Sequence, residues 1–296
     1  MRAKGICYTI VSALLFGVTP ALATWSYQLG SNAVTLTFFR NLMVTPILLI
    51  ILLMRKTDLR VTKKQFAAIL AVGIMGRGVT TLMLYSAYAY IGIGTSTTLH
   101  FLYPIFVALI CRLFYHEKLG IARLAALACA IIGVFLFMER GENFALSGIL
   151  LAAGSGLTYA LYMVGIEKLG LTEIDPLKLS FYMAAAVAVG VLLYDLPGRE
   201  IVYALPARAY GYTFVLAVCT SFFAVALLQV GIKCLSATTA ALFSLFEPIC
   251  GSLTGVFFLG EPMTVPKMAG SIIILIAAAI LAMAGKNSGK FRQAQT

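Results

Sequence analysis

Two charged residues, Arg77 and Glu247, lie about eleven residues inside long apolar stretches of the chain. A charge left in hydrocarbon costs on the order of 3 kcal/mol, so each side chain must be paired, neutralised or hydrated. At that depth a guanidinium and a carboxylate could bind the charged groups of a small molecule, and the carboxylate could also carry a coupling proton. A structural ion pair would satisfy the same two residues, as would hydrogen bonding of Glu247 beside a helix break at Pro248.

Polar and aromatic residues recur at helical spacing on four otherwise apolar segments. The four stripes are Arg77, Thr81, Tyr85 and Tyr88; Ser96, His100 and Tyr103; Ser155, Tyr159 and Tyr162; and Ala240, Ser244, Glu247 and Gly251. Such faces are best satisfied around one shared cavity, where tyrosine rings offer an amphipathic ligand both an apolar face and a hydroxyl. For the individual tyrosines, hydrogen bonding between packed helices is the alternative.

Five further residues are candidates for the same region. His100 could relay protons, because its unperturbed pKa is near 6.5, although a structural histidine explains it too. Gln229 is a weaker candidate for the cavity wall. Arg40 lies nearer a surface and is interpreted as either a gate or a structural residue. Pro104 and Pro248 each remove one helical hydrogen bond near the middle of a segment, which predicts a hinge or a simple packing kink.

The segments that carry these residues are too apolar for a water-soluble domain. Apolar residues make up 61% of the 296 residues, charged residues 11%, and the mean hydropathy is +0.98. We therefore predict an all-α membrane protein with ten transmembrane helices, each long enough to cross roughly 30 Å of hydrocarbon. The expected helices span about 6–27, 33–54, 66–89, 95–115, 121–138, 147–167, 177–194, 211–232, 237–258 and 266–285.

The chain also repeats itself once. Pro104 is followed thirteen residues later by Glu117, Pro248 is followed thirteen residues later by Glu261, and the two pairs lie 144 residues apart. We predict two repeats, residues 1–143 and 144–296, which together form one membrane domain. Five helices per repeat would invert the second relative to the first, and inverted repeats around a midplane cavity are typical of secondary transporters.

The distribution of basic residues predicts the orientation. With the N-terminus inside, the cytoplasmic segments hold 16 Lys and Arg and the outer loops hold four. This bias places both termini in the cytoplasm of a bacterial-type inner membrane. It also accounts for the net charge of +11, which would otherwise suggest a nucleic-acid partner. The basic start and Ala21-Leu22-Ala23 resemble a cleavable signal, but the match of the first helix to the sixth favours its retention.

Three motifs resemble the EamA-type members of the drug/metabolite transporter superfamily. They are Phe101-Leu-Tyr-Pro104 running into Glu117, Ser236 to Glu247-Pro248 ending at Leu259-Gly-Glu261-Pro262, and Phe38-Phe39-Arg40. The resemblance covers the whole chain, and it implies ten helices, a central cavity from both halves, and alternating access. Members of that family move amino acids, small metabolites and drugs, commonly outward. The first half departs from the family pattern, because His116-Glu117 replaces the usual Gly-Glu.

We therefore expect a secondary transporter that exports small amphipathic organic molecules and needs no cofactor. Uptake by the same architecture is the alternative. A membrane-embedded enzyme is a weaker one, because the chain has no GxxxxGK[ST], GxSxG or HExxH motif and its two histidines fall near opposite faces of the bilayer, which disfavours a metal site. Proton coupling and assembly into a homo-oligomer stay open, as do the substrate and the pairing of Arg77 with Glu247.

Overall fold

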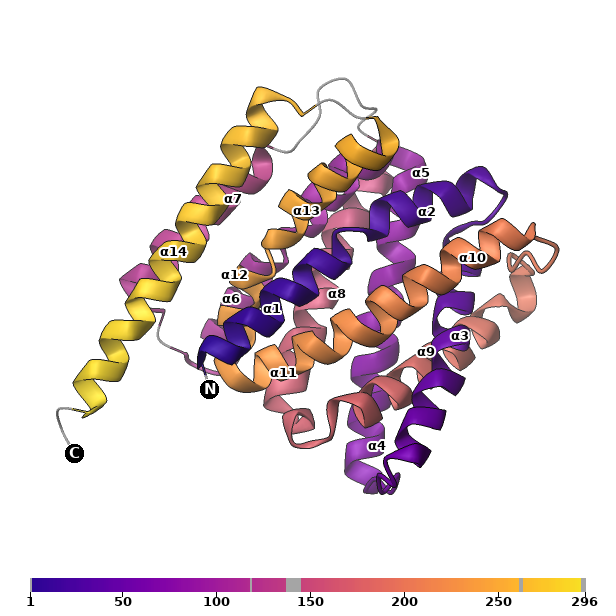
Figure 1. Cartoon of the computed structure of the whole chain (residues 1–296), viewed down its shortest axis with the longest axis horizontal. Helices are drawn as coiled ribbons and strands as arrows, with labels where there is room; N and C mark the ends of the chain where they lie inside the picture. Colours follow the sequence, from indigo (N-terminus) through magenta and orange to yellow (C-terminus); the bar gives the residue numbers. More distant parts are fainter. Residues whose placement is uncertain (1, 118, 137–144, 261–262, 294–296) are drawn as a thin grey trace.

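The computed structural model describes residues 2–117, 119–136, 145–260 and 263–293, with side chains of the last helix described to residue 280 and that of Leu259 left out. The described residues form helices joined by turns, with no strand among them (Figure 1). This confirms the prediction of an all-helical protein. The expected boundary between the repeats, at residues 139–143, lies outside the described residues, as does Glu261.

Apolar helices follow the expected order along the chain. Seven of those described are long and apolar enough to cross a membrane: Arg2–Gln28, Ala33–Met54, Lys63–His100, Leu146–Lys168, Pro176–Gly198, Ala207–Leu235 and Ala237–Phe258. Three shorter apolar helices are Tyr103–Phe114, Ile121–Phe135 and Val265–Ile280. The protein is therefore an integral membrane protein.

Half of the ten expected spans, 6–27, 66–89, 95–115, 211–232 and 237–258, are each divided between two or more helical segments. The first part of the chain forms α1 (Arg2–Phe16), α2 (Thr19–Gln28), α3 (Ala33–Met54), α4 (Lys63–Leu70), the π-helical η1 (Ala71–Gly78), α5 (Val79–His100), α6 (Tyr103–Phe114) and α7 (Ile121–Phe135). The second part forms α8 (Leu146–Lys168), the 3₁₀ turn η2 (Leu171–Glu173), α9 (Pro176–Gly198), α10 (Ala207–Leu216), the π-helical η3 (Ala217–Ala224), α11 (Val225–Leu235), α12 (Ala237–Phe243), α13 (Phe246–Thr254), the π-helical η4 (Gly255–Leu259) and α14 (Val265–Gln293).

The sharpest interruption divides α5. Ile91 has φ −133° and ψ 17°, and Gly92 has φ 72° and ψ 169°, a backbone conformation that only glycine adopts readily. This break lies where the sequence predicts the turn between the third and fourth spans. Pro104 and Pro248 lie in the first turns of α6 and α13, directly after two further breaks. A proline costs little there, because the first amides of a helix have no intrahelical acceptor.

Helices far apart in sequence pack as pairs. α1 packs on α11, α5 on α8, α3 on α9, α6 on α12, and α7 on α14, the last pair lying side by side at one edge of the bundle (Figure 1). The largest buried cluster lies between α6, α8 and α12 and includes Tyr103, Tyr162, Met163 and Phe243. Close approach depends on small residues: a Cβ on Gly156 of α8 would lie 2.8 Å from the His100 carbonyl oxygen. These pairs frame the interior in which the candidate polar residues lie.

Candidate functional site

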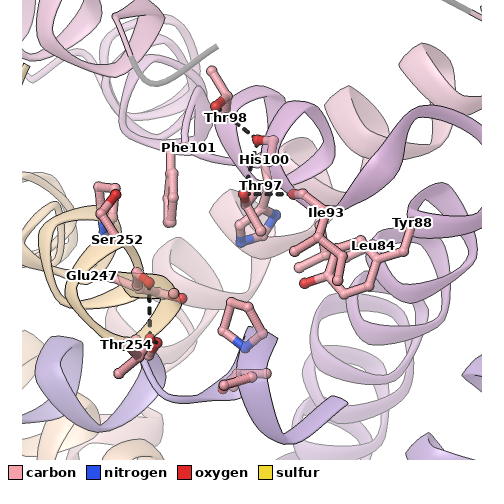
Figure 2. Close-up of a pocket in the computed structure, with 18 of the residues that line it drawn as sticks. Leu84, Tyr88, Ile93, Thr97, Thr98, His100, Phe101, Glu247, Ser252 and Thr254 are labelled. Atoms are coloured by element: carbon pink, nitrogen blue, oxygen red, sulfur yellow. Dashed lines mark hydrogen bonds between the residues drawn. The ribbon is translucent and has the colours of Figure 1, made fainter. Parts of the chain in front are cut away.

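Two adjacent hollows lie among the broken helices. The large chamber has a volume of about 420 Å³ and lies between the α1–α2 break, the α5 break and α13. The small chamber, of about 70 Å³, lies between α3, η1, α5 and α8. Four residues line both chambers: Thr19, Leu84, His100 and Glu247. Figure 2 shows His100, Phe101, Glu247 and Tyr88 around the large chamber.

Glu247 lies where the two chambers meet. It occupies the first turn of α13, where the helix dipole and the free amides favour a negative charge. Among the residues that the structure describes, none donates a hydrogen bond to this carboxylate and no cation lies within 4.0 Å of it. Arg77 and Glu247 therefore do not form the ion pair that was one interpretation of the sequence. The carboxylate faces the chambers as an available acceptor.

Arg40 is held on all three of its nitrogens. Nε donates to Ser221 Oγ at 3.0 Å, Nη1 to Tyr85 Oη at 2.6 Å, and Nη2 to Thr220 Oγ1 at 2.8 Å. The guanidinium also lies 5.8 Å from the centre of the Tyr85 ring. The side chain is buried at 6% exposure, so it does not extend to a membrane surface. Arg40 joins α3 and α5 to η3 while still lining the small chamber.

Arg77 is satisfied much less completely. It sits in the last turn of η1 and is also 6% exposed. Nη2 is 3.5 Å from the Ser221 carbonyl oxygen, and no described residue accepts a hydrogen bond from the buried Nη1. Gly76 allows this turn to pack against α8, since a Cβ there would lie 2.9 Å from Tyr162 Cβ. Arg77 therefore lines the small chamber, and its buried Nη1 has no hydrogen-bond acceptor among the described residues.

His100 is oriented by α8. Its Nδ1 lies 2.9 Å from Ser155 Oγ, and Ser155 Oγ in turn donates to the Ala152 carbonyl at 2.6 Å. Because that hydroxyl has one hydrogen, the histidine Nδ1–H must be the donor to it. The ring also contacts Tyr103 and Tyr159, at centroid distances of 5.5 and 5.3 Å. In the neutral ring this arrangement leaves Nε2 as the hydrogen-bond acceptor.

The structure brings most of the sequence-predicted residues to these chambers. The large chamber is lined by Tyr88, His100, Glu247 and Pro248. The small chamber is lined by Arg40, Arg77, Thr81, Tyr85, His100, Tyr159, Tyr162 and Glu247. Five candidates line neither chamber: Pro104, Tyr103, Ser155, Gln229 and Ser244. They are buried, with Tyr103 Oη donating to the Ala241 carbonyl at 3.4 Å and Ser244 Oγ to the Ala240 carbonyl at 3.0 Å.

Residues at the α1–α2 break are missing from the sequence-based set. Gly17, Thr19, Pro20 and Ala21 line the large chamber. Thr254 Oγ1 lies 2.9 Å from the Gly17 carbonyl oxygen and 2.8 Å from the Gly251 carbonyl oxygen, and the first of these contacts links α13 to the interrupted first span. A glycine and a proline three positions apart in an otherwise apolar segment signal such a break. Periodicity alone treats the segment as one continuous helix.

The turn after α6 shows how the unusual His116 is accommodated. Gly260 ends η4 with φ 71°, the left-handed conformation that favours glycine. His116 lies 144 residues earlier and has φ 51°. The backbone of the family's Gly-Glu turn is therefore kept in the first half, with a histidine in the position where the second half has glycine.

Sequence comparisons identify the family of this chain, and a solved structure shares its fold. The profile of the EamA-like transporter family matches twice, over residues 3–138 and 146–283. The uncharacterized transporter YcbK of Bacillus subtilis (strain 168) is 26% identical over 282 residues, which cover 90% of this chain and 89% of that protein. The pseudopaline exporter CntI of Pseudomonas aeruginosa is 24% identical over 96% of this chain and 97% of its own length. A solved crystal structure aligns with 97% of this chain and 99% of its own at a TM-score of 0.80 and 18% identity, which shows a shared fold. The chain belongs to the EamA-like transporter family.

Proposed function

We propose that this protein is a secondary transporter that exports small amphipathic organic molecules, including amino acids, from the cytoplasm by alternating access. The observation that carries the proposal is the composition of the two adjacent chambers. Glu247 lies at their junction without a protein partner, while two guanidiniums and several tyrosines line the same space. A volume of about 420 Å³ falls within the roughly 300–1,000 Å³ typical of small-molecule sites.

The proposed architecture is ten transmembrane helices in two inverted five-helix repeats, residues 1–143 and 144–296. Helix pairing supports it, because exchanging the two halves of the chain leaves the set of pairs unchanged. In the two halves, α1 corresponds to α8 and α5 to α11, so the pair α1–α11 becomes the pair α8–α5. The pairs α3–α9, α6–α12 and α7–α14 each join two corresponding helices, so the exchange leaves them unchanged. A pseudo-twofold relation between the halves would produce this pattern.

In the proposed topology, with both termini in the cytoplasm, the large chamber opens on the outer half of the membrane. Its lining includes Gly92, Gly255 and Lys267, which fall near the outer ends of their spans. On the cytoplasmic side, Lys168 Nζ is 2.5 Å from Glu117 Oε1 and 2.9 Å from Glu167 Oε1. Glu167 also accepts a hydrogen bond from the Ala237 amide at the start of α12. The arrangement is that of an outward-open carrier with a closed cytoplasmic end.

Glu247 is the proposed coupling residue. A carboxylate that meets both chambers can bind either a proton or the positive group of a substrate, and competition between the two would couple their movements. The export direction is supported by the relative named as an exporter, whose likeness extends over nearly the full length of both chains. Uptake by the same machinery is the second candidate, and a direct flux measurement separates the two.

Transport by purified protein in liposomes tests the proposal. Vesicles preloaded with single amino acids should accumulate labelled substrate by counterflow, with saturation. Glu247→Gln should retain exchange but lose accumulation driven by an imposed pH gradient. Glu173→Gln is the matched control, because Glu173 lies 3.7 Å from Lys233 on the exposed surface, away from both chambers. Absence of saturable counterflow across amino acids, other metabolites and cationic drugs would refute the transporter proposal, and full gradient-driven accumulation by Glu247→Gln would refute the coupling role.

A further inference from the structure

We infer that the small chamber is a subsite for the anionic head group of the substrate, with Arg77 as its binding residue. The substrates are thus molecules that carry a carboxylate or a similar anion next to an apolar body. This inference rests on the proposed function and narrows its substrate class. The observation behind it is that the buried guanidinium of Arg40 is hydrogen-bonded on every nitrogen whereas that of Arg77 is not.

The first step compares how the side-chain nitrogens of the two arginines are bonded. Each side-chain nitrogen of Arg40 donates a hydrogen bond to a protein hydroxyl, so its role in the small chamber is to contribute charge and hold Tyr85 in place. Arg77 has one long contact to a carbonyl and a buried Nη1 with no acceptor among the described residues. A buried charged donor without an acceptor is costly, so an acceptor supplied by the ligand is the natural complement.

The second step is the charge balance. The partners of Arg40 and Arg77 are neutral hydroxyls and a carbonyl, and no described carboxylate lies within 4.0 Å of either guanidinium. Among the residues that line the small chamber, two are cations and one, Glu247, is an acid. An anionic group bound at Arg77 would offset the excess positive charge in a medium where charges are weakly screened.

A second donor points to the same position. Tyr162 lines the small chamber, and its buried hydroxyl lies beside the Gln229 amide without a well-formed hydrogen bond to any described residue. Tyr162 is close enough to Arg77 for the two side chains to interact electrostatically. A carboxylate has two oxygens and about four acceptor sites, so it can accept from the guanidinium and the phenol together.

The sizes of the two chambers divide the substrate into a head and a body. The small chamber, at about 70 Å³, has room for a few waters or one functional group, since a water occupies about 30 Å³ of liquid. The large chamber offers Leu84, Tyr88 and Phe101 as apolar surface, seen together in Figure 2. The carboxylate of a bound substrate would therefore lie in the small chamber and the apolar body in the large chamber.

Ligand binding to purified, detergent-solubilised protein tests the subsite without requiring transport. The probes are 4-phenylbutyrate, its neutral amide and the cationic 4-phenylbutylamine, read by the shift in thermal unfolding. We expect the carboxylate to stabilise the protein and the amide and amine to bind at least about tenfold more weakly. Arg77→Gln should weaken carboxylate binding by roughly 10- to 100-fold, and Arg77→Lys should recover part of it. Arg112→Gln, which removes an exposed arginine at the end of α6, should leave binding unchanged.

The outcomes are separable. Equal binding of carboxylate and amide by the wild-type protein overturns the inference, as does undiminished carboxylate binding by a folded Arg77→Gln protein. If both Arg77 variants fail to fold, Tyr162→Phe replaces them and should weaken the carboxylate more than the amide; an equal loss for both probes counts against the subsite. Transport of neutral or cationic amphipaths without a preference for carboxylates would refute the anionic subsite but would be consistent with the proposed transporter function. Selective binding of carboxylates by a protein that transports nothing would support the subsite and refute the transporter function.

Discussion

Arg77 Nη2 lies 3.5 Å from the Ser221 carbonyl oxygen, and the two residues are 144 positions apart in the chain. The same offset separates Pro104 from Pro248 and His116 from Gly260. Residues in equivalent places of the two family matches therefore meet in the interior of the protein. Of this pair only Arg77 carries a charge. An exact repeat would have an arginine at both positions or at neither.

The left-handed turn at His116 gives a prediction about stability. A non-glycine residue in that conformation costs roughly 1–2 kcal/mol, of which glycine recovers a part after its own entropy cost. His116→Gly should therefore raise the free energy of unfolding by up to about 1 kcal/mol, measured as a higher unfolding temperature in detergent. Gly260→Ala is the converse experiment and should lower the free energy of unfolding, because alanine is strained at φ 71°; no atom of the described residues lies within 4 Å of the added Cβ, so the backbone strain is measured without a clash. A drop in stability for His116→Gly would contradict this account.

Lys168 gives a prediction about the cytoplasmic end. Its ammonium holds Glu117, whose amide donates to the Cys111 carbonyl at 3.1 Å, and Cys111 is fully buried. Lys168→Met should loosen this end and increase alkylation of Cys111 by a permeant maleimide several-fold, quantified by peptide mass spectrometry. The exposed Cys7 serves as the reference in the same molecule.

Lys233→Met is the matched control for Lys168, because Lys233 pairs with the exposed Glu173 at 3.7 Å. It should leave the ratio of Cys111 to Cys7 labelling unchanged. An unchanged ratio in Lys168→Met as well would show that the ion pair does not keep the cytoplasmic end closed.

The Arg40 cluster should be a structural anchor. Lysine cannot reach three acceptors with one ammonium, so Arg40→Lys should lower the free energy of unfolding by about 2–3 kcal/mol. Tyr85→Phe removes one acceptor and should cost about 1–3 kcal/mol. Tyr194→Phe, at a residue that is 58% exposed, should have almost no effect. Thermal or denaturant unfolding measures all three, and wild-type stability of Arg40→Lys would rule out the anchor.

Close packing of α8 on the segment after α5 gives the last prediction. A Cβ on Gly156 would lie 2.8 Å from the His100 carbonyl oxygen, so Gly156→Ala must displace backbone and should cost about 1–3 kcal/mol. It should also weaken ligand binding, since His100 lines both chambers. Gly211→Ala meets no atom within 4 Å and should stabilise α10 by about 0.5–1 kcal/mol. If the two variants behave alike, the contact at Gly156 does not limit packing.

Local pattern carried much of the prediction. Periodicity placed Arg77, Thr81 and Tyr85 on one helical face, and all three line the small chamber. The family membership predicted from the motifs is confirmed by two profile matches. These features depend on residues close together in sequence, where helical geometry fixes which side chains share a face.

Long-range partners could not be obtained in the same way. The sequence leaves open whether Arg40 is a gate or a structural residue. The hydroxyls that bind it in η3, the neighbour of α3, belong to Thr220 and Ser221, which lie 180 and 181 residues away in the chain. Tyr103 shares a face with His100 in the sequence pattern, but the break at 101–102 turns it into the packed core. Helical periodicity assumes one continuous helix, so it cannot indicate a point at which the backbone changes direction.

The π-helical segments η1 and η3 occupy corresponding stretches of the two halves and carry Arg77, Thr220 and Ser221. Each wide turn holds a surplus residue relative to an α-helix. If that surplus travels one position along the helix, the side chain it passes swings by about 100° around the axis, because an α-helix advances 3.6 residues per turn. A one-residue shift of the wide turn in η1 would thus re-orient Arg77 relative to the small chamber, and a shift in η3 would move the hydroxyls that hold Arg40, while the backbone stays hydrogen-bonded within the bilayer.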